Sequence, residues 1–219
     1  MFKVESHLPL IIATDGAKRK CGLSVGAAYI REPISERGRI TYKIERDSTH
    51  QRGELYGMLL GLTLAESVPN TCYIVTDSEY VFFMLYKRWY INWERKGWIT
   101  TEGEPVKNQD IIKQIVEVYE RVEHNVSLYH IKGHVIPFGK VTTARIMNAD
   151  PTGFKFYQHA FEKFANERHK RQKAIDNAMK LFETNMGYAP PMHSFIQLLV
   201  SNMVVDAAAT TMADRHVQP

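Results

Sequence analysis

The chain has 219 residues, 44% of them hydrophobic, which suits one domain or one domain with a large insertion. The apolar runs look too short for a membrane helix, and the stretch MFKVESHLPLIIATDG lacks the pattern of a signal peptide, since its apolar run is short and ends in an acid. Two cysteines, Cys21 and Cys72, make no disulfide framework, so we expect free thiols in a cytoplasmic protein without a membrane partner. The net charge of +4 suits a nucleic-acid partner but is also common in unrelated proteins.

The spacing of apolar residues predicts an alternation of strands and helices. Strands are predicted at 8–15, 24–30, 39–45, 71–77 and 126–134. Helices are predicted at 52–67 and 108–123, and Ser78 is expected to cap a further helix. The first three strands suggest an antiparallel meander, and the strand–helix–strand crossover that follows predicts parallel strands at 8–15 and 71–77. The sequence therefore predicts an α/β fold.

Three carboxylates occupy positions where this fold would bring them together. Asp15 and Asp77 each end a predicted strand, and Glu54 lies near the start of the first helix. Taken singly, each has a structural explanation: an acid at a helix start complements the helix dipole, and Asp77 suits a helix cap. Together they would repel one another unless a cation neutralised them, and carboxylate oxygens favour Mg²⁺ or Mn²⁺. Two such ions are a common device for phosphodiester chemistry, because one activates water and the other stabilises the leaving oxygen.

Six short motifs extend this pattern along the chain. They are TDG at 14–16, RGEL at 52–55, TDSEYV at 76–81, NWERKGW at 92–98, PVKN at 105–108 and IKGH at 131–134. In this order and spacing they resemble the type 1 ribonuclease H family, which cuts the RNA strand of RNA–DNA hybrids. The resemblance covers about residues 8–134 and resumes near 200. It implies a ribonuclease H-like fold, with a five-stranded mixed sheet flanked by helices.

The resemblance also implies a fourth carboxylate on the last helix, four residues after an asparagine. Asn202 and Asp206 in NMVVDAAAT have this spacing, and Asp206 is our assignment. Asp176 in KAIDNAMKL is the competing candidate, although no asparagine lies four residues before it. His134 resembles the family's loop histidine, thought to assist proton movement or product departure; alternatively it is an exposed loop residue.

A basic and aromatic segment, YKRWYINWERKGW at 86–98, matches the family's protruding element, hereafter the handle, which grips the DNA strand. Cations contact phosphates and aromatic rings pack on sugars or bases, although an aromatic pair four residues apart is also typical of core packing. The expected nucleic-acid contacts are Gly16, Lys18, Lys20, His50, Gln51, Glu79, Lys87, Arg88, Trp89, Asn92, Trp93, Arg95, Lys96, Lys107 and Asn108.

The chain departs from the family in two places. The loop AKRKCG at 17–22 has Ala17 where a serine is usual and is more basic, at a position where backbone groups approach the 2′-hydroxyls of RNA. A segment at 136–200 replaces a loop of about ten residues, so the catalytic domain would comprise 1–135 and 201–219. Phe154, Tyr157, Phe161 and Phe164 have helical spacing in this segment, which either packs on the core or covers the substrate with Arg168, Lys170, Arg171 and Lys173.

We therefore expect a monomeric endonuclease that hydrolyses the RNA strand of RNA–DNA hybrids. Asp15, Glu54, Asp77 and Asp206 would hold two Mg²⁺ or Mn²⁺ ions, and the products would carry 3′-hydroxyl and 5′-phosphate ends. A related nuclease for structured DNA or junctions, and a hybrid-binding module without catalysis, are the alternatives.

Overall fold

The computed structural model describes residues 8–31, 38–135 and 154–217. The side chains of residues 154–156 also lie outside the description. The expectations for the N-terminal stretch before Leu8, for the first part of the 136–200 segment and for the Phe154 side chain therefore concern residues outside the described part.

Five strands form one mixed sheet with the order β3-β2-β1-β4-β5. Strand β1 pairs antiparallel with β2 and parallel with β4, β2 pairs antiparallel with β3, and β4 pairs parallel with β5. The strands are β1 (Leu10–Lys18), β2 (Ser24–Arg31), β3 (Gly38–Glu45), β4 (Cys72–Thr76) and β5 (Val126–His130). The predicted meander and parallel crossover are both confirmed.

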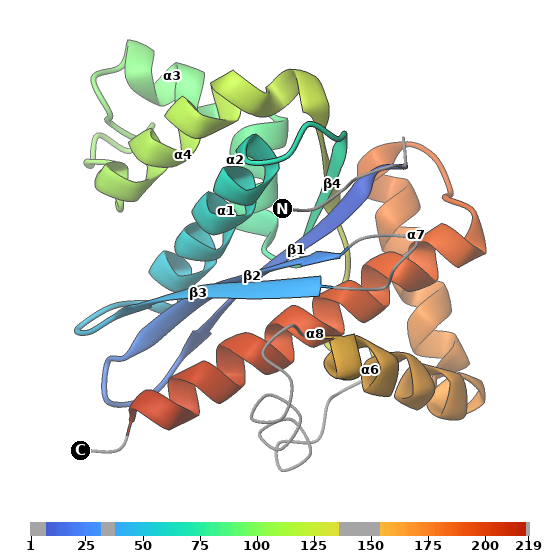
Figure 1. Ribbon diagram of the computed structural model, residues 1–219. Coiled ribbons are helices and arrows are strands. Elements are labelled where there is room, and N and C mark those ends of the chain that lie inside the picture. Colours follow the sequence, from blue (N-terminus) through green and yellow to red (C-terminus); the bar gives the residue numbers. More distant parts are fainter. Residues whose placement is uncertain (1–7, 32–37, 136–153, 218–219) are drawn as a thin grey trace.

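Helices cover both faces of this sheet (Figure 1). One face packs against α1 (His50–Glu66), α2 (Glu79–Tyr86), α3 (Trp89–Arg95) and α4 (Gln109–Val122). The other face packs against α6 (Phe154–Glu167), α7 (Gln172–Met186) and α8 (Met192–His216). Short 3₁₀ turns lie at Glu123–Asn125 and His169–Arg171. Alternate residues of β1 enter the two cores, Ile12 on the α1 face and Ile11 on the α8 face.

A row of glycines brings α1 unusually close to the sheet. Gly53, Gly57 and Gly61 recur once per turn along the helix. A Cβ atom on Gly57 would lie 2.6 Å from the carbonyl oxygen of Asp15, and one on Gly61 would lie 2.5 Å from Thr14 Cγ2. Glycine inside a helix costs about 0.5–1 kcal/mol relative to alanine, so close packing is what these three residues provide. The close approach places Glu54 directly beside β1.

The strand ends differ from the predicted ones. Strand β1 continues past Asp15 to Lys18 because its antiparallel pairing with β2 continues to that residue. Its parallel pairing with β4 ends one residue before Asp15, at the pair Thr14 and Thr76. Strand β5 ends at His130, so the IKGH motif forms a loop beyond the strand. Asp15 and Asp77 therefore both follow the last parallel pair, as the expected shared edge requires.

The described part of the insertion packs on the α8 face. Tyr157 and Phe164 of α6, with Ile175 and Phe182 of α7, belong to the same buried cluster as β1, β2 and α8. Of the two roles expected for the segment, this is the one in which it packs on the core. The expected boundary at 200 lies inside α8, because that helix is continuous from Met192 to His216.

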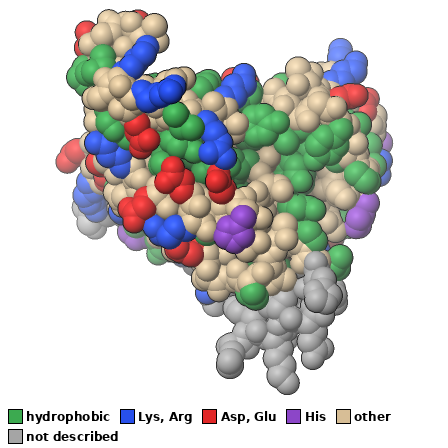
Figure 2. Space-filling view, turned by 90° about the horizontal axis from the view of Figure 1, so that it is seen from above, with side chains coloured by type: hydrophobic (Ala, Val, Ile, Leu, Met, Phe, Trp, Pro, Cys, Tyr) green, Lys and Arg blue, Asp and Glu red, His purple; other side chains and the backbone are tan. Residues whose placement is uncertain are grey.

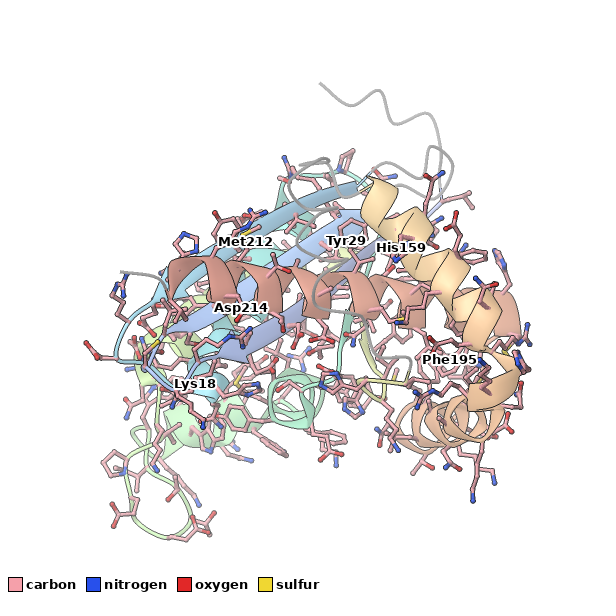
Figure 3. All side chains as sticks on the ribbon, turned by 90° about the horizontal axis from the view of Figure 1, so that it is seen from below. Lys18, Tyr29, His159, Phe195, Met212 and Asp214 are labelled. Carbon is pink, nitrogen blue, oxygen red and sulfur yellow. The ribbon has the colours of Figure 1, made fainter. Side chains whose placement is uncertain are left out.

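Helix α8 shows that the expectation about apolar length was wrong. By length and apolar composition alone, this helix could cross a membrane. However, 78% of its apolar 18-residue stretch is buried inside the protein. The apolar composition of α8 is that of a core helix lying along the sheet, with Asp214 near Lys18 at one end and Phe195 at the other (Figure 3).

Candidate active site

Asp15, Glu54 and Asp77 come together from three elements. Each offers a carboxylate oxygen, and these three oxygens lie within 4.8 Å of one another. Asp15 and Glu54 are buried, and Asp77 is partly buried. The backbone N–H of Gly16 donates to Asp15 Oδ1 at 2.7 Å. A Cβ atom on Gly16 would overlap the backbone nitrogen of Glu54, so glycine is needed for the two carboxylates to approach.

Asp206 and His134 lie at the same hollow. The hollow has a volume of about 520 Å³, and all four carboxylates and His134 line it. His134 Nδ1 lies 3.2 Å from Asp206 Oδ2, with the histidine side chain 72% exposed and the aspartate side chain 22% exposed. His134 has a φ of 54°, so the loop turns sharply at this residue. Asp176 is exposed on α7, where it accepts a hydrogen bond from Gln172, and is not among the residues that line the hollow.

Three of the four carboxylates, Asp15, Glu54 and Asp206, have pKa values raised by burial and by neighbouring charges. Burial raises the pKa of Asp15 well above its usual value, and the charges of Glu54, Asp77 and Asp206 raise it further. Burial, followed by the charge of Asp77, raises the pKa of Glu54 to about 8. Burial also raises the pKa of Asp206, although the neighbouring His134 lowers it. A cation among these oxygens would remove the repulsion.

The donor set fits a hard divalent cation. It is made of carboxylate oxygens alone, the type of ligand that Mg²⁺ and Mn²⁺ prefer. Glu54 Oε2 is buried and has no hydrogen-bond partner among the described residues. A buried carboxylate oxygen without a partner is costly, and coordination would satisfy it.

Two residues that we did not assign from the sequence crowd Asp77. Asn202, which the sequence offered only as a spacing marker, donates from Nδ2 to Asp77 Oδ2 at 3.4 Å. A Cβ atom on Gly133 would overlap Asp77 Oδ2 and would lie 2.9 Å from Asp77 Cγ. The glycine of the IKGH motif therefore leaves room for the carboxylate.

The basic loop at 17–22 is anchored to the end of α8. Arg19 Nε donates to Asp214 Oδ1 at 2.6 Å, and an Arg19 terminal nitrogen donates to the carbonyl oxygen of Thr210 at 2.8 Å. Arg19 is thus held within the protein, whereas the expected contacts Lys18 and Lys20 are exposed. Lys18 lines the hollow beside Gly16.

The expected nucleic-acid contacts near α1 differ in how they are bonded to the rest of the protein. His50 and Gln51 line the hollow, and His50 Nε2 lies 3.6 Å from Glu54 Oε1. The Asn108 amide nitrogen donates to Gln51 Oε1 at 3.1 Å, so these two side chains hold each other. Arg52, which we did not assign from the sequence, donates from Nε to Glu45 at 2.7 Å and links β3 to α1. Lys107 is exposed.

The handle is formed by α3 and its flanking turns. Trp89 and Trp93 are partly buried against the α1-side core, with their ring centroids 6.4 Å apart. Arg88 is ion-paired with Glu123 at 2.7 Å, so it is less available than expected. Glu79, Lys87, Asn92, Arg95 and Lys96 are exposed. Charged side chains gather over this end of the molecule, at the left of Figure 2, whereas hydrophobic side chains dominate the right.

The basic residues of the insertion lie on the turn between α6 and α7 and in the first turn of α7. Arg168, Lys170, Arg171 and Lys173 are exposed, and Arg171 lies 3.8 Å from Glu167. None of them lines the hollow, although Phe164 of α6 lies in a small cavity with His134 and Asp206. Their role over the substrate stays a prediction.

The chain matches a known protein family over more than half of its length. The family model described as RNase H matches residues 8–140. The chain is 38% identical over 93 residues to a ribonuclease H of Pseudomonas putida, covering 42% of this chain and 59% of that protein. It is 32% identical over 127 residues to a ribonuclease H of Clostridium botulinum, covering 57% of this chain and 83% of that protein. The matched segment therefore spans less than two thirds of the Pseudomonas relative.

Two solved structures show weaker likenesses. The crystal structure of LC9-RNase H1, a type 1 RNase H with the type 2 active-site motif, has a TM-score of 0.48 and 17% identity, covering 57% of this chain and 63% of that chain. The solution structure of the PFV RNase H domain has a TM-score of 0.48 and 20% identity, covering 58% and 81%. The family match itself ends before α6, so α6, α7 and α8 lie beyond it.

Proposed function

Because the chain belongs to the ribonuclease H family, we propose that it hydrolyses the RNA strand of RNA–DNA hybrids in the cytoplasm, as a monomer. The observation that carries the proposal is the cluster of Asp15, Glu54 and Asp77, whose oxygens lie within 4.8 Å of one another in a chain of this family. Asp206 faces the same hollow from α8 and would complete the site. The products would carry 3′-hydroxyl and 5′-phosphate ends.

These four carboxylates would hold Mg²⁺ or Mn²⁺, as two ions. When bound, the ions would supply Lewis-acid activation of water and stabilisation of the leaving oxygen. The protein's own part is to hold the ligands in place: the glycines of α1 fix Glu54 against β1, and the end of the parallel ladder sets Asp15 beside Asp77. Such prior positioning removes the reorganisation that free ligands would need.

His134 is proposed to move a proton or assist product departure. Its side chain is exposed at the rim of the hollow and lies 3.2 Å from Asp206. An imidazole can donate or accept a proton near neutral pH, and Asp206 would orient the ring. Replacing His134 with alanine should therefore lower kcat more than it raises the KM for hybrid.

Selectivity would come from the lining of the hollow and from the handle. Gly16, Lys18, His50 and Gln51 line it and are proposed to meet the RNA strand, where 2′-hydroxyls distinguish RNA from DNA. The exposed cations and half-buried tryptophans of the handle are proposed to contact the DNA strand.

A labelled RNA–DNA hybrid incubated with Mg²⁺ tests the proposal. We expect cleavage of the RNA strand and no cleavage by the Asp77→Asn variant; intact RNA with the wild type, or full cleavage by the variant, would refute the proposal. Duplex DNA, double-stranded RNA and a four-way junction, assayed in parallel, separate hybrid cleavage from action on structured DNA. Salt-sensitive binding without turnover would instead indicate a binding module.

A second pair of variants tests the fourth carboxylate. Asp206→Asn should abolish cleavage, whereas Asp176→Asn should leave it unchanged, because Asp176 is exposed on α7. Loss of cleavage in the second variant alone would show that Asp206 is wrongly assigned.

A further inference from the structure

One polar contact joins the last turn of α7 to the strand beside the carboxylates. Asn185 Nδ2 lies 2.7 Å from Nδ1 of His130, the last residue of β5. His130 Nε2 lies 3.3 Å from the backbone carbonyl oxygen of Asp77. Two hydrogen bonds thus run from the insertion through His130 to the backbone of Asp77, a residue whose carboxylate belongs to the candidate active site.

The partners determine which ring nitrogen carries the proton. The carbonyl oxygen of Asp77 only accepts hydrogen bonds, so Nε2 must carry a proton and donate. The amide nitrogen of Asn185 only donates, so Nδ1 must be unprotonated and accept. The neutral Nε2–H tautomer alone satisfies both contacts.

The surroundings hold this arrangement in place. His130 is 2% exposed, and its ring lies 5.5 Å from the ring of Phe82 and 6.2 Å from that of Phe83, measured between centroids. With so little of the residue exposed, the protein supplies the partners of both ring nitrogens. Because the ring is buried, its orientation depends on the two hydrogen bonds and on these aromatic neighbours.

This contact ends at the backbone carbonyl oxygen of Asp77. The backbone of Asp77 leaves β4 immediately after its last parallel pair, Thr76 with His130. The backbone N–H of Ile131 donates to the carbonyl oxygen of Thr76 at 3.1 Å, so the carbonyl of Asp77 receives its side-chain donor just beyond the ladder. The contact holds the peptide plane that follows the Asp77 Cα atom, from which the carboxylate side chain extends.

We propose that Asn185 and His130 are positioning residues for Asp77, through which the insertion supports the candidate metal site. The inference rests on the proposed function, since it assumes that Asp77 is a metal ligand. It gives the insertion a role within the site itself, in addition to its packing on the core. Groups that orient a metal ligand typically change metal affinity or activity 10- to 100-fold when they are removed.

Two variants and a control test the proposal. Asn185→Leu removes the donor to Nδ1. The double variant His130→Phe with Asn185→Leu removes both hydrogen bonds but keeps an apolar ring between Phe82 and the insertion. Because neither replacement side chain has a polar atom that needs a partner, we expect it to fold even if Asn185→Leu alone does not. Glu183→Ala on the same helix is the matched control, because Glu183 is exposed and lies only two residues before Asn185.

The measurements are the Mn²⁺ dissociation constant by electron paramagnetic resonance, the ¹⁵N resonances of the His130 ring, and kcat and KM for hybrid. In the wild type we expect a protonated Nε2 and an unprotonated Nδ1. In both test variants we expect Mn²⁺ affinity to fall about 10- to 100-fold and kcat to fall with it, while the KM for hybrid stays within about twofold. The control should match the wild type in every measurement.

Wild-type Mn²⁺ affinity in either folded test variant would overturn the proposal, because a merely structural contact would leave the metal site intact. A protonated Nδ1 in the wild type would also overturn it. Failure of the proposed function looks different: the wild type would bind Mn²⁺ and show the expected His130 resonances, yet would leave hybrids uncut.

Discussion

Gly133 offers a sharp test of how closely the site is built. The residue lies in the loop after β5, and a Cβ atom there would overlap Asp77 Oδ2 and lie 2.9 Å from Asp77 Cγ. Gly133 does not have a positive φ, so alanine fits the backbone without strain. Ordinary contact between nonbonded atoms needs about 3.5–4.0 Å, so Gly133→Ala must displace the Asp77 carboxylate by roughly 1 Å or more.

This displacement should change the stability of the protein little and its activity greatly. The obstructing atoms are at the end of a side chain, which can rotate away, so we expect the free energy of unfolding to change by less than about 1 kcal/mol. A shift of about 1 Å in a catalytic group can lower the rate about 10²-fold. Gly133→Ala should therefore lower kcat on hybrid about 100-fold and raise the Mg²⁺ concentration needed for half-maximal rate.

The assay is a Mg²⁺ titration of hybrid cleavage, with urea unfolding of the same preparations. Gly103→Ala is the control: its Cβ would meet no atom within 4 Å, and its φ of 84° confines the cost to local strain of about 1–2 kcal/mol. A folded Gly133→Ala variant that retains wild-type kcat and Mg²⁺ dependence would contradict this prediction. A variant that is destabilised as much as a core mutant would contradict it equally.

Three further predictions concern charge. The folded-state pKa of Glu54, about 8, lies above its ordinary value of 4.5, so its proton stabilises the folded state fully below pH 4.5 and this contribution is lost as the pH rises to about 8. In EDTA the melting temperature should therefore fall over that range, and Mg²⁺ should restore it most at the upper end; a flat profile would contradict the burial argument. Arg52→Ala should lower the free energy of unfolding by roughly 1–2 kcal/mol in urea, because Arg52 donates to Glu45 and holds the pKa of that carboxyl at about 2. The Glu45 contribution is present above its ordinary pKa of 4.5 and lost as the pH falls through 2, so the variant should lose stability less steeply in acid than the wild type. Arg19→Ala should lower unfolding stability by about 1 kcal/mol and Asp214→Ala by less, since the bond from Arg19 to the Thr210 carbonyl survives in the second; equal losses would exclude the backbone contact.

The order of elements and the identity of three carboxylates could be predicted from the sequence because both depend on local patterns. Strand and helix spacing is visible within a short window, and Asp15 and Asp77 each follow an apolar strand. The crossover rule then places the two strands side by side without any further information. The spacing from Asn202 also led to Asp206, which the structure places at the same hollow.

Contacts between distant segments could not be read in this way. Arg19 and Asp214 are separated by 195 positions, and Arg52 and Asp110 by 58, so nothing local indicates that each pair meets. The same is true of Asn185 and His130. His130 lies inside the strand predicted at 126–134, and both the strand's end and the partner of His130 are decided by how the segments pack.

The sequence by itself determined the chemistry available at the site, because carboxylates placed after strands bring oxygen ligands to one edge of a sheet. Only the tertiary structure decided how tightly that site is held. The glycines of α1, the space left at Gly133 and the contact from Asn185 through His130 act across distances of a few ångströms between elements far apart in the chain. Such contacts arise from close packing of whole helices on the sheet, a property of the assembled fold that no short stretch of sequence contains.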